Sequence, residues 1–177
     1  MYPNDFRAYN NLGELAFAAG DAAKAESYFK QAASKNANAP EVNANLGLCE
    51  LVKGNVAAAE SYLGKATGAN AANEALGNLY IKQGQYDRAV NAFGDAKTNS
   101  AAQAQILAKD YNKAKATLSA IKNPDAMTDY LMAIVGARTN NASLVSSSIK
   151  SAIAKDASMA QRAANDREFA KFADSIK

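Results

Sequence analysis

Two asparagines, Asn11 and Asn45, each directly precede a Leu-Gly pair and stand 34 residues apart. An asparagine side chain offers one acceptor and two donors, so it can bond both the N–H and the C=O of a peptide group. Repeated at a fixed step, such side chains would form a ladder along the backbone of an extended ligand, whatever the ligand's sequence. The alternative is that both are solvated residues of an Asn-rich chain. The ladder would have only two rungs, because Ala75 stands at the third equivalent position.

The residues of common catalytic and metal sites are missing or stand in the wrong pattern. The chain contains no His, which excludes triads and metal sites built on imidazole. Glu26-Ser27 and Glu60-Ser61 resemble the Glu-Ser pair of α-superhelical lytic transglycosylases, but their recurrence at equivalent positions indicates structure. Cys49 is alone, which excludes an intramolecular disulfide and favours a small buried apolar residue. We therefore predict a protein that is not an enzyme, without catalytic residues, metal site or cofactor.

The composition and the net charge limit the possible fold classes and binding partners. The net charge is +3 and the charges of both signs are interspersed, without the dense basic stripe that nucleic-acid binding requires. No stretch approaches the roughly 20 apolar residues of a membrane span. Apolar residues make up 49% of the chain, Ala is the commonest of them, and there are only three Pro. Because Ala has the highest helix propensity and no strand-like alternation is found, we predict an all-α fold.

A sequence unit recurs three times and explains these helices. "NLGELAFAAGDAAKAESYFKQA" (11–32) aligns without gaps on "NLGLCELVKGNVAAAESYLGKA" (45–66), and "ALGNLYIKQGQYDRAVNAFGDA" (75–96) keeps the same internal spacing. Each copy has a Leu-Gly pair, a second Gly seven residues later, and then Ala, a bulky apolar residue and Ala. This pattern predicts two antiparallel helices, with the second Gly ending the first helix at positive φ and small residues allowing close approach. Such pairs must stack on neighbours to bury their apolar faces.

The unit resembles the tetratricopeptide repeat, whose signature is W-x₂-L-G-x₂-Y…A-x₃-F…P. Tyr9 stands at the opening aromatic position of the first copy and Tyr80 at the later Tyr position of the third. The resemblance is specific over residues 6 to 97 and fades beyond. It implies a right-handed α-solenoid with a C-terminal capping helix, forming a single domain over 1–177. The expected repeats are 6–39, 40–69, 70–97, 98–123 and 124–157, with the cap helix at 158–177.

Three departures from the strict period carry further expectations. The step from Gly47 to Gly77 is 30 residues, which indicates that about one helical turn is missing between the second and third units. The fourth unit leaves only 98–107 for its first helix, which must therefore be short. In the cap, an apolar stripe at i, i+3, i+4 and i+7 predicts a helix that covers the last repeat. Its members are Phe169, Phe172, Ala173 and Ile176.

The first residues of the chain resemble the closing residues of a preceding repeat. Pro3 stands where the closing Pro of a preceding copy would fall, so we expect "YPND" (2–5) to be the tail of a repeat and the chain to be a piece of a longer protein. The alternative is a native start in which Asn4 or Asp5 caps the first helix.

In such a solenoid the first helix of each pair lines the concave side, and its outward residues are the candidate contacts. They mix amide, acidic and apolar groups, which suits an extended peptide or a partner helix. The candidates are Arg7, Asn10, Asn11, Glu14, Phe17, Asn45, Leu48, Asn78 and Lys82. The two-rung ladder resembles the asparagine ladder of O-linked N-acetylglucosamine transferase. The carboxylate clamp for chaperone tails is rejected, because Glu14, Glu41 and Glu74 would repel a carboxylate.

We therefore expect a non-catalytic scaffold that binds a protein or peptide in the concave groove. The alternative is an assembly module that docks on other parts of its parent protein or self-associates through the open N-terminal repeat face. The partner and the compartment cannot be read from the residues. The sequence "AANDREFAKFADS" and the Asn- and Ala-rich composition are similar to repeat proteins of Bacteroidetes, which implies a bacterial cell-envelope location.

Overall fold

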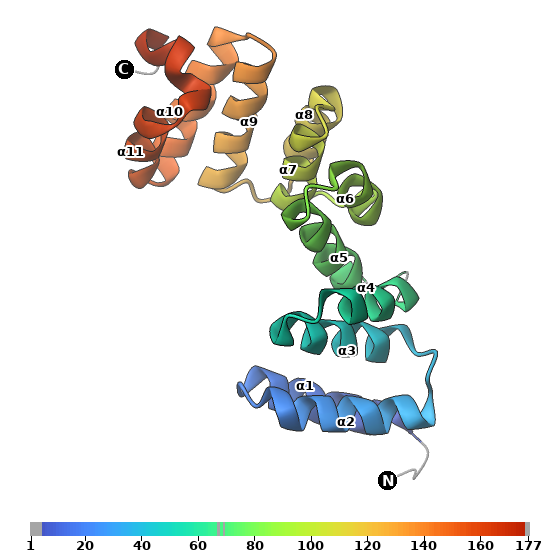
Figure 1. The fold of residues 1–177 in the computed structure, drawn as a ribbon. Helices are drawn as coiled ribbons and strands as arrows, with labels where there is room; N and C mark the ends of the chain where they lie inside the picture. Colours follow the sequence, from blue (N-terminus) through green and yellow to red (C-terminus); the bar gives the residue numbers. More distant parts are fainter. Residues whose placement is uncertain (1–4, 67, 69, 176–177) are drawn as a thin grey trace. The chain divides into compact units, whose positions relative to one another are not determined.

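The computed structural model describes residues 5–66, 68 and 70–175, and within them the regular elements are all helices. The chain divides into two compact units, Met1–Leu79 and Tyr80–Lys177, with the boundary inside α5. Up to that boundary the helices are α1 (Phe6–Ala18), α2 (Ala22–Lys35), α3 (Pro40–Lys53), α4 (Val56–Lys65) and α5 (Asn70–Lys82) (Figure 1). The second unit continues with α6 (Tyr86–Phe93), α7 (Asn99–Leu107), α8 (Tyr111–Ser119), α9 (Ala126–Arg138), α10 (Ala142–Lys155), α11 (Ser158–Asn165) and the 3₁₀ helix η1 (Arg167–Ser175). The division into one domain with five repeats stays a prediction.

Small residues set the distance between paired helices in the first unit. A Cβ built on Gly13 would lie 2.4 Å from the ring of Phe29, and one on Gly47 would lie 2.6 Å from Leu63. No real side chain tolerates such distances, so α1–α2 and α3–α4 approach each other as closely as they do only because these positions lack a Cβ. Phe29 and Leu63 are both almost fully buried. The packing that the sequence pattern predicted at these positions is confirmed.

The turns between paired helices all contain a residue with positive φ. Gly20 and Gly54 adopt φ of 82° and 81°, as the sequence predicted for a residue that ends a helix. In the second unit Gly84 keeps this turn with φ of 72°, and in the two later pairs its place is taken by Lys109 at φ 64° and by Asn140 at φ 55°. The left-handed turn is thus kept where the glycine is lost.

Helix lengths follow the irregular spacing of the sequence. α4 has 10 residues against 14 in α2, which accounts for the shortened step after the second pair. α7 has only nine residues and begins after Thr98, whose hydroxyl accepts a hydrogen bond from the N–H of Ala101. The first helix of the fourth pair is therefore short, as predicted.

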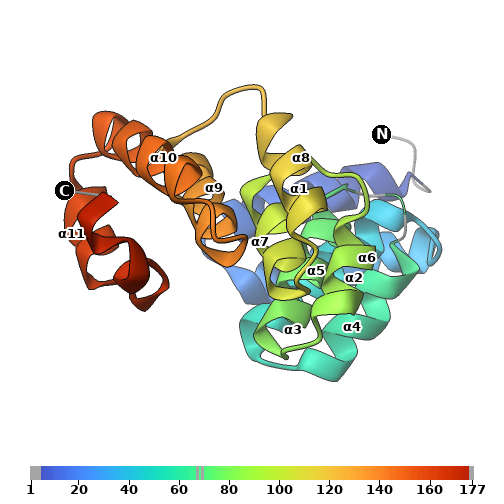
Figure 2. The same ribbon diagram turned by 90° about the horizontal axis from the view of Figure 1, so that it is seen from above.

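The C-terminal segment is two elements, not the one cap helix that was predicted. α11 ends at Asn165, Asp166 has an extended backbone with ψ of 122°, and η1 follows as a 3₁₀ helix. Asp166 breaks the helix because its two carboxylate oxygens accept bonds from the N–H of Glu168 and the hydroxyl of Tyr130. Phe169 is nonetheless buried, and α11 and η1 pack on α10, with η1 also on α9 (Figure 2).

The apolar stripe of the cap is confirmed in part. Phe172 is buried with Phe169, whereas Ala173 is exposed. Pro3, Asn4 and Ile176, for which the sequence predicted roles, lie outside the described residues.

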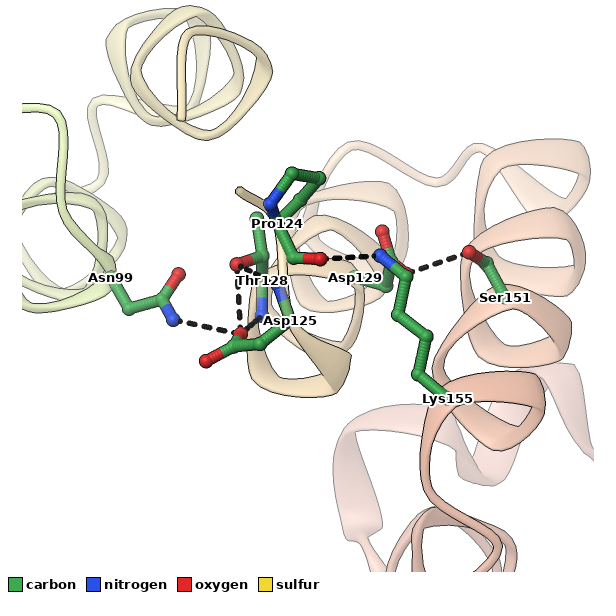
Figure 3. Close-up of polar contacts among 7 residues, drawn as sticks. All are labelled: Asn99, Pro124, Asp125, Thr128, Asp129, Ser151 and Lys155. Carbon is green, nitrogen blue, oxygen red and sulfur yellow. Dashed lines mark hydrogen bonds and ion pairs between the residues drawn. The ribbon is translucent and has the colours of Figure 1, made fainter. Parts of the chain in front are cut away.

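A capping box fixes the start of α9 within the second unit. The carboxylate of Asp125 accepts hydrogen bonds from the backbone N–H of Thr128 at 2.7 Å and from the side chain of Asn99 on α7 at 3.0 Å (Figure 3). The bond from the Thr128 backbone is the main cause that lowers the pKa of Asp125. The cap thus ties the beginning of α9 to the beginning of α7.

A second polar group holds α9 to α10. The ammonium of Lys155 donates to the carbonyl of Pro124 at 2.9 Å and pairs with the carboxylate of Asp129 at 2.7 Å (Figure 3). Ser151 donates to the same Asp129 oxygen. These contacts form a polar link beside the buried cluster of Ala133, Val145, Ile149 and Ala152 that the two helices share.

Candidate functional site

A pocket opens on the face that α1 and α3 share in the first unit. Its volume is about 130 Å³. Its walls are the apolar side chains of Phe17 and Leu48, and its polar groups are Glu14 and Asn45. It is lined by Glu14, Phe17, Ala18, Phe29, Asn45 and Leu48, and we call it the α1–α3 pocket. Residues on the outward side of both helices are thus brought together by the packing of one pair on the next.

A hydrogen-bonded amide network forms the polar edge of this pocket. Asn10 is only 5% exposed and donates from its amide to Glu14 Oε1 at 2.7 Å. Asn45 on the next pair donates to Asn10 Oδ1 at 3.0 Å and to Glu14 Oε1 at 3.2 Å. Both amide hydrogens of Asn45 are therefore used within the protein, and its side-chain oxygen takes no part in the network.

The two asparagines that the sequence placed at equivalent repeat positions have different surroundings. Asn45 is half-buried and held by the network, whereas Asn11 is exposed on α1. Asn11 has the freedom to bond a peptide through both ends of its amide, and Asn45 does not. The two rungs of the predicted ladder are thus unequal.

Arg7, at the start of α1, is engaged by its own N-cap. Its guanidinium donates to both carboxylate oxygens of Asp5, at 2.9 and 3.0 Å. This bonding raises the pKa of Arg7 and lowers that of Asp5, chiefly through the side-chain hydrogen bonds. The side chain of Arg7 is otherwise open to solvent, so it presents a neutralised charge at this end of the face.

The remaining candidates lie on α5. Asn78 is half-buried within the first unit, and Lys82 is exposed at the last residue of the helix, in the second unit. Neither lines the α1–α3 pocket.

Two residues of the pocket were missed by reasoning from the sequence. Ala18 follows Phe17 at the outward edge of α1, and the helical spacing could have included it. Phe29 is the bulky residue of the repeat pattern, and it was assigned to packing alone. The ring of Phe29 packs against Gly13 and also forms part of the pocket lining.

The described residues assemble no metal site and include one buried thiol. In the part of the chain that the structure describes, no three His, Cys, Asp or Glu side chains come together as metal ligands would. Cys49 is buried, and burial raises the pKa of its thiol, which makes it the inert apolar residue that the sequence predicted. Within the described residues every helix is too short or too polar to cross a lipid bilayer.

Comparison with known proteins supports the interpretation of the sequence as a series of helical repeats. Two family models for the tetratricopeptide repeat match the chain, one over residues 16–80 and one over residues 71–101. A search of curated proteins found no match.

Several solved structures share the fold. A tetratricopeptide repeat protein from Parabacteroides merdae is 17% identical with a TM-score of 0.74, over 97% of this chain and 76% of its own. YrrB, described as a tetratricopeptide protein with an unusual peptide-binding site, is 18% identical with a TM-score of 0.69, over 92% and 93%. PilW, a type IV pilus biogenesis factor, is 20% identical with a TM-score of 0.67, over 96% and 83%.

These likenesses show an all-α solenoid built from helical pairs. Proteins of this family and fold typically act as non-catalytic scaffolds that bind proteins or peptides. Together, the recurring Gly contacts, the left-handed turns and the family matches identify residues 16–101 as tetratricopeptide repeats.

Proposed function

We propose that this protein is a non-catalytic scaffold that binds an extended polypeptide across the face shared by α1 and α3. The α1–α3 pocket is the observation that supports the proposal. Small-molecule sites usually enclose roughly 300–1,000 Å³, whereas this pocket has about 130 Å³. That volume suits one side chain of a longer ligand, which would continue over the exposed Asn11 and the neighbouring surface.

The character of the face agrees with a peptide ligand. It combines apolar walls with exposed amide and carboxylate groups, as grooves that bind peptides do. The fold of YrrB, whose description names a peptide-binding site, shows that a solenoid of this kind can carry such a function.

The test is a selection of peptides from a random dodecapeptide phage library on the whole chain. Selected peptides are then measured by fluorescence anisotropy against the wild type and Leu48→Ala. Truncating Leu48 removes a wall of the pocket, and loss of one such anchor weakens binding by about tenfold. Val56→Ala is the matched control, because Val56 is an exposed apolar residue of the same unit outside the pocket.

The proposal requires peptides that bind Val56→Ala like the wild type and bind Leu48→Ala about tenfold more weakly. Peptides that bind Leu48→Ala and Phe17→Ala unchanged would place the ligand elsewhere. A selection that returns no binding peptide contradicts the proposed function altogether.

A second candidate function is self-association through the first helix pair. Leu12 is 38% exposed and Leu15 is 69% exposed, although both are large apolar residues. They are three residues apart and so lie on one side of α1. Exposed neighbouring apolar side chains of this kind favour an interface.

Light scattering at high protein concentration separates the two candidates. A dimer that dissociates on Leu15→Arg would support self-association through α1. A wild-type protein that stays monomeric at millimolar concentration would exclude it and leaves the peptide proposal standing alone.

A further inference from the structure

The polar edge of the α1–α3 pocket presents only acceptors to a ligand. Glu14 Oε1 already accepts two hydrogen bonds, from Asn10 and Asn45. Its other oxygen, Oε2, receives no bond from any of the described residues, and Glu14 forms no ion pair among them. Since both amide hydrogens of Asn45 are used, the groups of these two residues that remain for a ligand are the second carboxylate oxygen of Glu14 and the side-chain oxygen of Asn45.

Acceptors and one negative charge call for a cationic donor. The apolar lining from Phe17, Phe29 and Leu48 calls for a hydrocarbon stem behind that donor. Lysine and arginine side chains combine the two, because their methylene stems lie along apolar surface while the charged end reaches polar groups.

The number of available carboxylate oxygens distinguishes the two cations. Arginine binds carboxylates best through two parallel bonds to both oxygens, whereas lysine acts as a point charge with three donors. One carboxylate oxygen of Glu14 already accepts two hydrogen bonds within the protein. The two parallel donors of an arginine guanidinium would therefore find only one carboxylate oxygen without a partner. An ammonium that bonds Glu14 Oε2 or Asn45 Oδ1 leaves the hydrogen bonds of the network in place, because these two oxygens take no part in them.

We propose that the α1–α3 pocket takes a lysine side chain of the bound polypeptide, with Glu14 and Asn45 receiving the ammonium and Phe17 and Leu48 enclosing the stem. This rests on the proposed function, and it adds the chemistry of the residue that is recognised. The opposite preference, for acidic peptides, is disfavoured by the same carboxylate.

The experiment compares selections from the random dodecapeptide library on three proteins: wild type, Glu14→Gln and Glu14→Lys. Glu14 is exposed, so both variants are expected to fold, which circular dichroism checks. Only Gln keeps an oxygen that can accept from Asn10 and Asn45. Wild-type peptides should be enriched in lysine, Glu14→Gln should lose the enrichment, and Glu14→Lys should select acidic residues instead.

Single peptides from the wild-type selection then give the magnitude. Replacing the selected lysine by norleucine keeps the stem and removes the charge, and should weaken binding by about three- to tenfold. Replacing the selected lysine by arginine should weaken binding by a smaller factor than the replacement by norleucine. On Glu14→Gln the lysine and norleucine peptides should bind alike, because the charge that distinguishes them has lost its partner.

Failure of the lysine assignment and failure of the proposed function would give different results. Peptides that are sensitive to Leu48→Ala but show no lysine enrichment, or that bind Glu14→Gln as tightly as the wild type, overturn the lysine assignment and leave the proposed function intact. A selection without any peptide that responds to Leu48→Ala overturns both.

Discussion

The first helix pair, α1–α2, and the fifth, α9–α10, solve the same packing problem with the glycine contact at different positions along the helices. In α1–α2 a glycine at position 13 receives the ring of Phe29. When Val145, Ile149 and Ala152 are aligned with the Ala-Phe-Ala pattern of α2, Ala133 stands at the place of Gly13. The glycine of this pair that faces the second helix is instead Gly136, where a Cβ would lie 3.0 Å from the backbone nitrogen of Val145.

This difference shows what the repeat requires. In these two pairs a glycine on the first helix faces a larger residue on the second, but the position along the helices at which they meet differs. The same holds for a polar position: Asn10 and Tyr130 stand at equivalent places, and each bonds a residue 35 or 36 positions later. In the first pair the bond joins α1 to α3, and in the fifth it joins α9 to Asp166, before η1.

The largest effect is expected from giving the first pair the small residue of the fifth. Gly13→Ala places a Cβ within 2.9 Å of three atoms of a buried ring. The steric cost, about 3 kcal/mol at the upper end for overpacked cores, exceeds the helix propensity gain of about 1 kcal/mol. We expect a net loss of about 2 kcal/mol in the free energy of unfolding, measured by urea denaturation.

Two companion variants make this test sharp. Gly64→Ala is the control, because a Cβ there meets no atom within 4 Å, and it should gain up to about 1 kcal/mol. Gly13→Ala combined with Phe29→Ile reproduces the Ala133–Ile149 arrangement. The double variant should be more stable than the sum of the single changes predicts; simple additivity would show that the two pairs are not equivalent.

A smaller loss is expected from Tyr130→Phe in the fifth pair. Its hydroxyl donates to Asp166 at 2.6 Å, and its ring lies at 89° to Phe169 in an edge-to-face contact. Removing a hydrogen bond to a charged acceptor costs about 1.5 kcal/mol. Tyr86→Phe, the same change at a half-buried tyrosine of α6, should stay within about 0.5 kcal/mol of the wild type.

The pH dependence identifies the cause of that loss. Burial, and then the bond to Asp166, raise the pKa of Tyr130 above its ordinary value of 10.0. A raised pKa contributes stability that is complete below about pH 10 and declines as the pH rises towards the folded-state pKa. The difference between the wild type and Tyr130→Phe should therefore narrow above about pH 10. A difference that is constant with pH would assign the loss to packing alone.

Much of the fold followed from the sequence because the first three pairs repeat glycine at both special places, the close contact and the turn. The later pairs were harder to predict for a physical reason. Lys109 and Asn140 take the left-handed turn without being glycine, so the strongest local signal is absent there. The cap was predicted as one helix because Phe169 and Phe172 are three residues apart, a spacing that an α-helix and a 3₁₀ helix share.

The site could be predicted only at the level of faces. Spacing within one pair placed Glu14 and Asn45 on the outward side of their helices. Which amide bonds which carboxylate depends on the distance between neighbouring pairs, and no periodicity within one pair encodes it. The contact of Asn45 with Asn10 therefore became visible only in the structure, and it determines which atoms of the pocket remain for a ligand.

The smallest effect is expected at the turn of the fourth pair, and it is a gain. Lys109 adopts φ of 64°, a conformation that costs an L-residue about 1 kcal/mol and glycine almost nothing. The larger entropy of glycine in the unfolded chain offsets part of this, so Lys109→Gly should raise the free energy of unfolding by about 0.5 kcal/mol.

Ala108→Gly, one residue earlier, is the control for this gain. Ala108 has φ of −75° in the right-handed region, where glycine brings only its entropy cost, and about 0.5 kcal/mol should be lost. Opposite signs at two adjacent residues would show that the left-handed turn itself, and not general loop flexibility, is what the first and fourth pairs share. Equal losses at both positions would mean that Lys109 is held without strain, and the turns of the two pairs would then differ in more than their sequence.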